Sequence, residues 1–184
     1  MGSINPNHTL YFAYGSNLWL AQMKKRCPDS ALVGMAILPA HRWVITIRGY
    51  ANILPADPET SVYGVVYTLS PSDEEKLDVH EEVATGGYNK VMLDVHLTTG
   101  TEDSPMGGRE TKCLVYIDPR PQTGPPRHEY IGRINRGLED AKLPESWVEK
   151  NIRPFIPPEH SKQALEQSAD LTALAPPFTL VSFQ

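Results

Sequence analysis

The sequence predicts an α+β protein in which a few helices surround a mostly antiparallel, barrel-like mixed sheet. Six short segments rich in Val, Ile, Tyr and Thr have the composition of β-strands, and Pro- and Gly-bearing linkers separate them. The chain of 184 residues contains 13 Gly and 17 Pro residues, which favours many turns over a bundle of long helices. Its length fits one domain over residues 1–184, with a core over 9–157 and a Pro-rich tail over 158–184 that wraps around it.

The strands are predicted from local composition, taken in chain order. The expected segments are residues 9–13, 31–38, 42–48, 62–69, 88–97 and 112–118. Residues 63–67 are almost continuously apolar, which is typical of a central strand that is covered on both faces. Residues 98–110 are the most polar linker, so we expect an exposed hairpin loop there.

The helices are predicted from capping residues and apolar spacing. Ser70 followed by Pro71 and Asp73 is typical of a helix start, and that helix should end between residues 79 and 81. Residues 127–142 carry an apolar stripe at helical spacing. Three shorter helices are expected, over 18–26, 144–152 and 161–171. We expect Asn17 to cap the first of them, whose last turn carries cations.

Composition also excludes several classes of protein. The formal net charge is −5 and no basic block is present, so we expect no nucleic-acid partner. The longest apolar run spans ten residues, 31–40, which is too short to cross a bilayer, so no membrane association is expected. The N-terminus does not resemble a signal peptide, and Cys27 and Cys113 have no neighbouring thiol, so we expect a cytoplasmic protein with reduced cysteines.

The histidines do not form a pattern that binds metal. His80-Glu81 resembles the start of a zinc-binding motif, but Ala84 stands where the second His would be needed. Gly107-Gly108-Arg109 lacks the Lys-Ser/Thr that completes a phosphate loop. We therefore predict no metal and no cofactor.

The first segment with chemical potential is Tyr11-Phe12-Ala13-Tyr14-Gly15-Ser16-Asn17-Leu18. It indicates a strand, a tight turn at Gly15 and the start of a helix. Glycine lets a backbone approach a ligand closely, and N–H groups at such a turn can bind a carboxylate or an oxyanion. The same pattern also fits an ordinary turn between a strand and a helix.

The second segment is the acidic run Glu74, Glu75, Asp78, Glu81 and Glu82. On the predicted helix, Glu81 lies at the negative C-terminal end and Asp78 lies one turn before it. Both effects would raise the pKa of Glu81, as a general base acting near neutral pH requires. The same acids also fit a solvated helix face.

These segments together resemble the γ-glutamylcyclotransferase family. Residues 11–18 resemble its N-terminal signature, 63–67 its central strand and 77–83 the segment that carries its catalytic glutamate. The resemblance extends from about residue 9 to residue 157. It implies that Glu81 is the catalytic base and that Tyr88 and Tyr130 contact substrate. With the signature, the implied substrate-binding residues are Tyr11, Phe12, Ala13, Tyr14, Gly15, Ser16, Asn17, Tyr88 and Tyr130.

The resemblance also implies an activity. A cyclotransferase of this family needs no metal or cofactor and closes the γ-glutamyl group of a small molecule to 5-oxoproline, as a lyase or acyltransferase in glutathione metabolism. The leaving group is an amino acid or an amine. Cyclotransferases for γ-glutamyl amines or for glutathione, and a non-catalytic binding module that keeps the fold, remain as alternatives. A homodimer remains open.

Two positions depart from the family pattern. Glu82 stands where the family usually has Gly, and Arg48 is an addition to the region 48–52. Arg48 either forms a surface salt bridge or faces the site and binds a substrate carboxylate.

Overall fold

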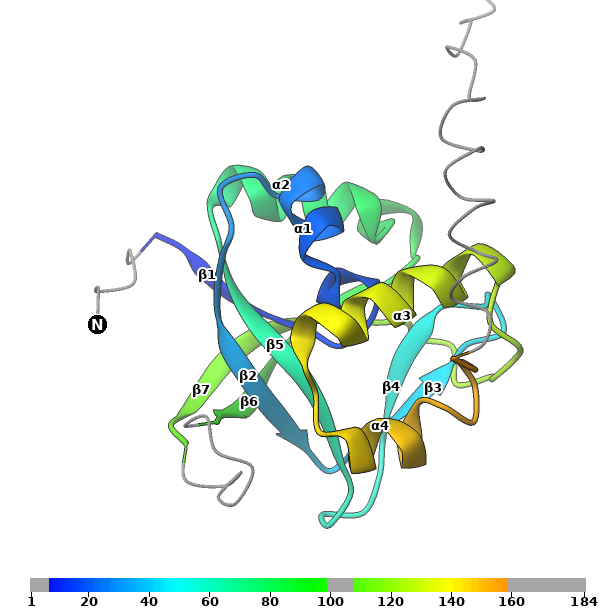
Figure 1. Ribbon diagram of the computed structural model, residues 1–184. Helices are drawn as coiled ribbons and strands as arrows, with labels where there is room; N and C mark the ends of the chain where they lie inside the picture. The colour runs from blue at the N-terminus through cyan, green and yellow to red at the C-terminus, as the bar shows by residue number, and fades with distance from the viewer. Residues whose placement is uncertain (1–6, 99–107, 159–184) are drawn as a thin grey trace, which may run out of the picture.

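Five strands close into a barrel in the computed structural model, which describes residues 7–98 and 108–158 (Figure 1). Each neighbouring pair is antiparallel except β1 and β7, which meet in parallel at Tyr11 and Leu114 and close the barrel. The predicted α+β class with a mostly antiparallel, barrel-like sheet is therefore confirmed. In spatial order the strands are β1 (Thr9–Ala13), β5 (Ser61–Leu69), β2 (Ala31–Pro39), β6 (Asn89–Leu97) and β7 (Glu110–Ile117).

Most residues of strand β5 are buried, as its apolar run predicts, and the strand is paired along both edges like every strand of the closed barrel. It pairs with β1 on one side and with β2 on the other. Val62, Val66 and Leu69 are completely buried. The register places Tyr67 opposite Tyr11, and their rings lie parallel with centroids 6.4 Å apart. This pairing sets the first wall of the site described below.

The strand predicted over 42–48 is too long, and a strand that follows it was missed. The chain forms β3 (His41–Ile45), reverses, and returns as β4 (Ala51–Pro55) in a separate two-stranded hairpin. The Thr46 N–H donates to the Tyr50 carbonyl at 2.8 Å. Gly49 adopts a φ of 85°, which favours glycine and lets the chain reverse there. Arg48 is therefore a turn residue and not part of a strand.

The later helices follow the sequence signals. Helix α2 (Pro71–His80) begins where the Ser70 hydroxyl accepts the Asp73 N–H at 3.2 Å. Helices α3 (His128–Ala141) and α4 (Glu145–Asn151) lie within the predicted ranges. A short 3₁₀ helix, η2 (Val83–Thr85), follows α2. The predicted helix over 161–171, the Pro-rich tail after 158 and the tip of the 98–110 loop lie outside the described residues.

The first helix starts later than predicted, and Asn17 does not cap it. A 3₁₀ turn, η1 (Ser16–Leu18), precedes α1 (Leu20–Arg26), whose N-cap residue is Trp19 without a side-chain hydrogen bond. The Asn17 side chain is 3% exposed and turns inward, because buried partners use both its amide nitrogen and its oxygen. This correction moves Asn17 from a structural cap to the wall of a pocket.

Three elements bring the site together at one end of the barrel. Helices α1 and α2 lie side by side there, and α3 runs across toward the β3–β4 hairpin (Figure 1). A Cβ at Gly137 of α3 would lie 2.7 Å from the Leu18 Cβ, so α3 and η1 pack backbone to backbone. The same close packing carries Tyr130 to the turn at Gly15.

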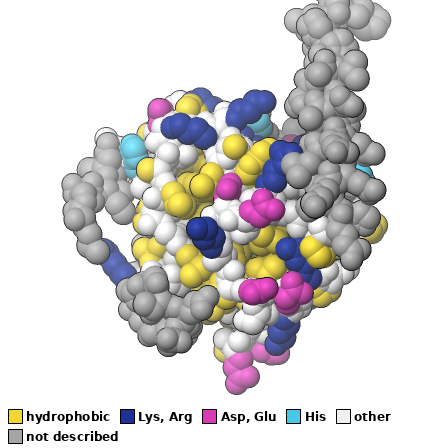
Figure 2. All heavy atoms as spheres, viewed as in Figure 1, with side chains coloured by type: hydrophobic (Ala, Val, Ile, Leu, Met, Phe, Trp, Pro, Cys, Tyr) yellow, Lys and Arg dark blue, Asp and Glu magenta, His cyan; other side chains and the backbone are white. Residues whose placement is uncertain are grey.

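The surface carries charges of both signs. On the face shown in Figure 2, Lys and Arg side chains are interspersed with Asp and Glu side chains. Within the described residues, no helix has the length and apolar character needed to cross a bilayer.

Candidate active site

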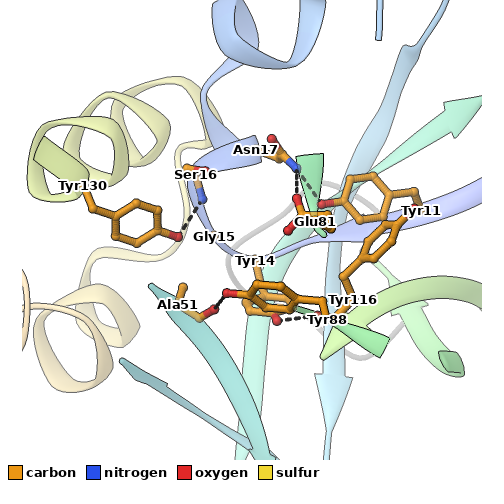
Figure 3. Close-up of a pocket in the computed structure, with 10 residues that line it drawn as sticks. All are labelled: Tyr11, Tyr14, Gly15, Ser16, Asn17, Ala51, Glu81, Tyr88, Tyr116 and Tyr130. Carbon is orange, nitrogen blue, oxygen red and sulfur yellow. Dashed lines mark hydrogen bonds between the residues drawn. The ribbon is translucent and has the colours of Figure 1, made fainter. Parts of the chain in front are cut away.

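A small pocket lies where the ends of β1 and α2 meet the start of α3 (Figure 3). Its volume is about 40 Å³, and it adjoins an outer pocket of about 130 Å³. Ser16, Glu81, Tyr88 and Tyr130 line both spaces. The full lining of the inner pocket is Tyr11, Tyr14, Gly15, Ser16, Asn17, Ala51, Glu81, Tyr88, Tyr116 and Tyr130.

Glu81 is the only carboxylate among the described residues that line the inner pocket. It follows directly after α2, and its N–H donates to the Leu77 carbonyl at 2.9 Å. Its side chain is 15% exposed, whereas that of the adjacent Glu82 is 55% exposed. The helix end thus turns one acid of the run inward and leaves its neighbour at the surface, as a general base at this position requires.

The electrostatics of Glu81 favour a carboxyl group that titrates above its usual range. Burial raises its pKa, while Arg26 and the hydrogen bond from Asn17 oppose the rise. The Arg26 Nη1 is 3.7 Å from the Glu81 Oε1. The expected contribution of Asp78 is not found, because Asp78 pairs with Lys90, whose Nζ lies 3.0 Å from its Oδ2. The direction of the shift matches the sequence prediction, but burial is its main cause.

Asn17 connects the carboxylate to the wall of the pocket (Figure 3). Its Nδ2 donates to the Tyr11 Oη at 2.9 Å and to the Glu81 Oε1 at 3.3 Å. Its Oδ1 accepts from the Gln22 Nε2 and from the Arg26 Nη1, both at 3.0 Å. With both ends of the amide engaged, the NH₂ group can only face Glu81. The carboxylate is therefore held in one orientation by a residue that is itself fixed.

The turn at Gly15 brings backbone N–H groups to the pocket. The Ser16 N–H donates to the Tyr130 Oη at 3.2 Å. A Cβ at Gly15 would lie 2.9 Å from that same oxygen, so only glycine lets the tyrosine approach. Burial raises the pKa of Tyr130 to about 12, which keeps its phenol protonated at neutral pH. The turn thus offers hydrogen-bond donors from both the backbone and a side chain.

Three other tyrosines form walls whose hydroxyl groups are already engaged. The Tyr14 Oη donates to the Tyr116 carbonyl at 2.5 Å, and the Tyr88 Oη donates to the Ala51 carbonyl at 2.8 Å. The Tyr116 Oη donates to the Asp78 Oδ1 at 2.6 Å. These bonds fix the shape of the pocket before any ligand enters.

The outer pocket has a different chemistry, because basic side chains outnumber acidic ones in its lining. Three arginines and one histidine face two glutamates there. Burial and the nearby Arg26 lower the pKa of His80, which favours its neutral form. The residues that line this pocket are Ser16, Arg26, Arg48, Tyr50, His80, Glu81, Glu82, Tyr88, Tyr130 and Arg133.

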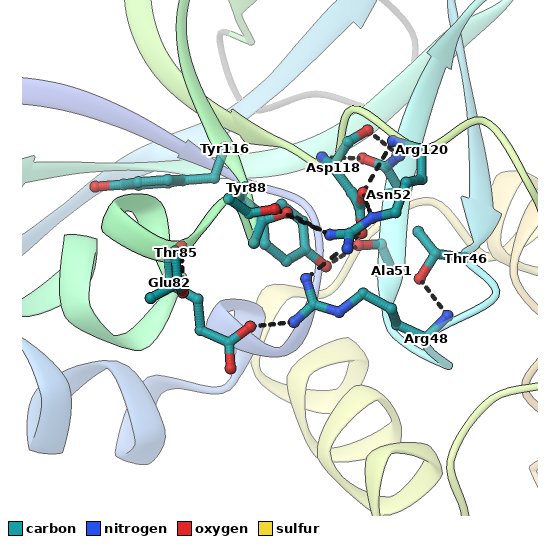
Figure 4. Close-up of polar contacts among 12 residues, drawn as sticks. Thr46, Arg48, Ala51, Asn52, Glu82, Thr85, Tyr88, Tyr116, Asp118 and Arg120 are labelled. Carbon is teal, nitrogen blue, oxygen red and sulfur yellow. Dashed lines mark hydrogen bonds and ion pairs between the residues drawn. The ribbon is translucent and has the colours of Figure 1, made fainter.

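Arg48 reaches into the outer pocket from the β3–β4 turn (Figure 4). Its Nη2 forms an ion pair with the Glu82 Oε2, and its Nη1 lies 3.6 Å from the Asp118 Oδ2. Its guanidinium carbon is 5.7 Å from the centre of the Tyr88 ring. The predicted salt bridge is present, and the side chain also faces the pocket, so both interpretations describe part of its surroundings.

Most of the predicted site residues come together, but two do not. Phe12 and Ala13 are completely buried and line neither pocket. Strand alternation turns Phe12 away from the face of Tyr11, and Ala13 pairs with Val65 in the sheet. The inner pocket contains the predicted Tyr11, Tyr14, Gly15, Ser16, Asn17, Glu81, Tyr88 and Tyr130, and the outer pocket contains Arg48.

Several residues of the site were not predicted. Gln22 and Arg26 stand four residues apart on α1, a spacing that places both on one helix face and could have indicated a shared partner. Tyr116 and Ala51 carry no signal in the sequence, since only the barrel and the hairpin bring them to the pocket. The others are Tyr50, His80 and Arg133 of the outer pocket.

The described residues offer no competing centre for metal or thiol chemistry. Within 7–98 and 108–158, no group of three or more His, Cys, Asp and Glu side chains could hold a metal ion. Cys27 and Cys113 are buried free thiols, and burial raises the pKa of each to about 12. A thiol with so high a pKa is a poor nucleophile at neutral pH.

Comparison with known proteins finds similar sequences and a similar fold. A model of the AIG2-like family matches residues 61–150. A human protein named γ-glutamylcyclotransferase is 28% identical over 171 residues, and a mouse protein of the same name is 27% identical over 175 residues. Each alignment covers 88% of this chain and 86% of the relative. A solved structure named γ-glutamyl cyclotransferase is 25% identical, with a TM-score of 0.70 over 86% of this chain and 99% of that one.

The family model covers three of the five barrel strands, the end of α2 that carries Glu81 and the start of α3 that carries Tyr130. The matched range includes residues 77–83, one of the segments that carry the resemblance. By sequence and by fold, the chain is similar to proteins named γ-glutamylcyclotransferase.

Proposed function

We propose that the protein converts a γ-glutamyl amino acid or a related γ-glutamyl amide to 5-oxoproline and a free amino acid or amine, with Glu81 as general base and acid. The names of the relatives support the reaction class. The observation that carries the proposal is the largely buried Glu81 carboxylate, which Asn17 holds at the base of a small pocket beside the Gly15 turn.

The substrate contains its own nucleophile, the α-amino group, which is an ammonium at neutral pH. Glu81 accepts one proton from it, and the freed nitrogen attacks the γ-carbonyl carbon to close a five-membered ring. The amide C–N bond breaks as Glu81 returns the proton to the leaving nitrogen, and a second proton passes from the ring nitrogen to solvent. A carboxyl group whose pKa lies above its usual range suits both transfers.

The attack places negative charge on the former carbonyl oxygen. N–H groups of the Gly15–Ser16 turn, together with the protonated Tyr130 phenol, are donors close enough to stabilise it. In the absence of substrate, the Ser16 N–H donates to the Tyr130 Oη. In the reaction, this N–H would donate to the oxyanion in place of the Tyr130 oxygen. Every step uses side chains and backbone groups of this chain, so the mechanism includes no metal or cofactor.

Release of 5-oxoproline tests the proposal. Wild-type protein is incubated with γ-glutamyl-alanine, glutathione and a γ-glutamyl amine, beside the Glu81→Gln variant. Glu81→Gln keeps the shape of the side chain and removes the base, so turnover should fall by roughly 10²–10⁴. Glu75→Gln removes the same charge from an exposed position of α2 and is the matched control.

Two results would contradict the proposal. Binding of γ-glutamyl compounds without any release of 5-oxoproline would indicate a binding module that keeps the fold without the reaction. An active Glu81→Gln variant beside an inactive Glu82→Gln variant would show that the base is the next residue.

A further inference from the structure

Arg48 and Glu82, the two positions set apart in the sequence analysis, lie against each other in the fold. Arg48 and Glu82 are 34 residues apart in the chain, yet the Arg48 guanidinium pairs with the Glu82 carboxylate at the outer pocket (Figure 4). Neither Arg48 nor Glu82 lines the inner pocket, so the chemistry of that pocket gives no role to either residue. A shared position at the outer pocket points to a shared role there.

Glu82 occupies a backbone position that suits glycine. Its φ and ψ are 54° and 37°, in the left-handed region that residues with a Cβ rarely adopt. Helices commonly end with glycine in this conformation. A glutamate at this position carries a backbone cost that a glycine avoids, while its carboxylate reaches Arg48.

The two partners differ in how firmly they are held. The Arg48 side chain is 22% exposed and lies beside Tyr88 and the completely buried Asp118 carboxylate, which Arg120 already binds at 2.6 Å. The Glu82 side chain is 55% exposed. An exposed carboxylate leaves such a pair at little cost, whereas the guanidinium stays in place.

The Arg48 Nη1 faces the interior, 3.6 Å from the Asp118 Oδ2. It is buried and makes no hydrogen bond with the residues that the structure describes. Nη1 lies toward Asp118, so Nη2, which now pairs with Glu82, is the group of Arg48 that a ligand carboxylate can reach by displacing Glu82.

We propose that Glu82 is a built-in carboxylate that occupies Arg48 until the carboxylate of the departing amino acid displaces it. The inference rests on the proposed function. The γ-glutamyl amine must reach Glu81 in the inner pocket, so the leaving group extends into the larger outer pocket. When the substrate carboxylate replaces that of Glu82, the Arg48 guanidinium still has a carboxylate partner. Arg48 and Glu82 together therefore determine the preference for a leaving group that bears a carboxylate.

The test compares two substrates that differ only in that carboxylate, γ-glutamyl-alanine and γ-glutamyl-ethylamide. The measured quantity is the preference, defined as the ratio of kcat/KM for the first substrate to that for the second. It is measured for wild type, Arg48→Met, Glu82→Gln and the double variant. Glu75→Gln removes an exposed acid of α2 outside both pockets and controls for net charge.

The expected results have opposite signs. Arg48→Met should lower the preference by about tenfold or more, since it removes a charge-assisted pair. Glu82→Gln should raise the preference by about threefold, because the competing carboxylate is gone. In the Arg48→Met background, Glu82→Gln should change nothing, since its effect acts through Arg48. Arg48→Lys, made in case Arg48→Met fails to fold, should also lower the preference, because an ammonium lacks the planar pair of donors.

Other results would overturn the inference. A preference that stays unchanged in folded Arg48→Met or Arg48→Lys would show that Arg48 does not bind the carboxylate. An effect of Glu82→Gln that persists in full without Arg48 would show simple charge repulsion in place of competition. With either of these two results, release of 5-oxoproline from both substrates by the wild type would leave the proposed function standing, and only this inference would fail. Release from neither substrate would refute the proposed function itself.

Discussion

Asn17→Asp is the substitution that most directly tests how Glu81 is held. The two side chains have the same shape, but the amide NH₂ that now donates to the Glu81 Oε1 at 3.3 Å becomes a carboxylate oxygen. The new carboxylate would accept from the Gln22 and Arg26 donors that bind Asn17 today, and the Tyr11 phenol could turn to donate to it. With these donors around it, residue 17 should hold the negative charge and Glu81 the proton.

The size of the effect follows from the distance. Two charges 3.3 Å apart repel by about 5 kcal/mol at an effective dielectric constant of 20. Arg26, in contact with both residues, offsets a large part of this repulsion. Because one pKa unit corresponds to about 1.4 kcal/mol, we expect the upper apparent pKa of the pair to rise by roughly 1–2 units.

The assay is the pH dependence of kcat/KM for 5-oxoproline release. Glu81 must be ionised to accept a proton, so activity rises with pH through its pKa in the free enzyme, which burial already places above the usual range. In Asn17→Asp this rise should move upward by roughly 1–2 pH units, with most activity recovered at high pH. Asn89→Asp adds the same charge at an exposed position of β6 and should leave the profile in place.

A folded Asn17→Asp variant whose profile stays in place or moves to lower pH would refute this reasoning. Either result would mean that Glu81 is not the group whose titration limits the reaction, or that Asn17 does not contact it in solution. Thermal unfolding measured beside the kinetics establishes that the variant is folded.

Three further predictions follow from the same site. Gly15→Val should lower kcat/KM by about 100-fold, because a Cβ there already meets the Tyr130 Oη at 2.9 Å; near-normal kinetics would show that the substrate does not approach this turn. Activity should survive prolonged treatment with a chelator, and loss of activity that zinc restores would contradict the mechanism. Folding raises the pKa of Glu81 above 4.5, so the wild type loses stability as pH rises from there through the raised value. Denaturant unfolding should therefore find Glu81→Gln more stable relative to wild type at pH 8 than at pH 4, and a difference that does not depend on pH would contradict the buried carboxyl group.

The elements that follow from local chemistry could be predicted from the sequence. Ser70 and Pro71 determine the start of α2 through one side-chain bond and one fixed backbone angle, and both effects act within four residues. The apolar run in β5 indicates a strand that is covered on both faces, which is where the barrel places it. Glu81 could be found for the same reason, since its position at the end of α2 depends on that helix alone.

The errors occur where the outcome depends on distant residues. Asn17 is a residue type that often caps helices. Only the folded structure shows that its amide instead donates to Tyr11 and Glu81 in the pocket. Phe12 and Ala13 belong to a signature whose neighbours line the site, but strand alternation turns Phe12 to the other face and Ala13 is buried in the sheet opposite Val65, so membership of the signature does not give contact. The β3–β4 reversal depends on the positive φ of Gly49. The sequence does not distinguish this glycine from one in an ordinary linker, so the reversal could not be predicted.

Arg48 and Glu82 show how the fold adds meaning to single positions. Taken alone, each of these residues could be explained from the sequence as an ordinary surface charge. Their contact changes that assessment, because a glutamate in a left-handed conformation and an arginine in a tight turn now account for each other. The turn that separates β3 from β4 carries Arg48 to the outer pocket, and the end of α2 carries Glu82 there beside Glu81. Loss of Glu82 would leave Arg48 beside Asp118 and open to a ligand carboxylate, whereas loss of Arg48 would leave Glu82 without its ion-pair partner, so we expect the effect of Glu82 on substrate preference to depend on Arg48.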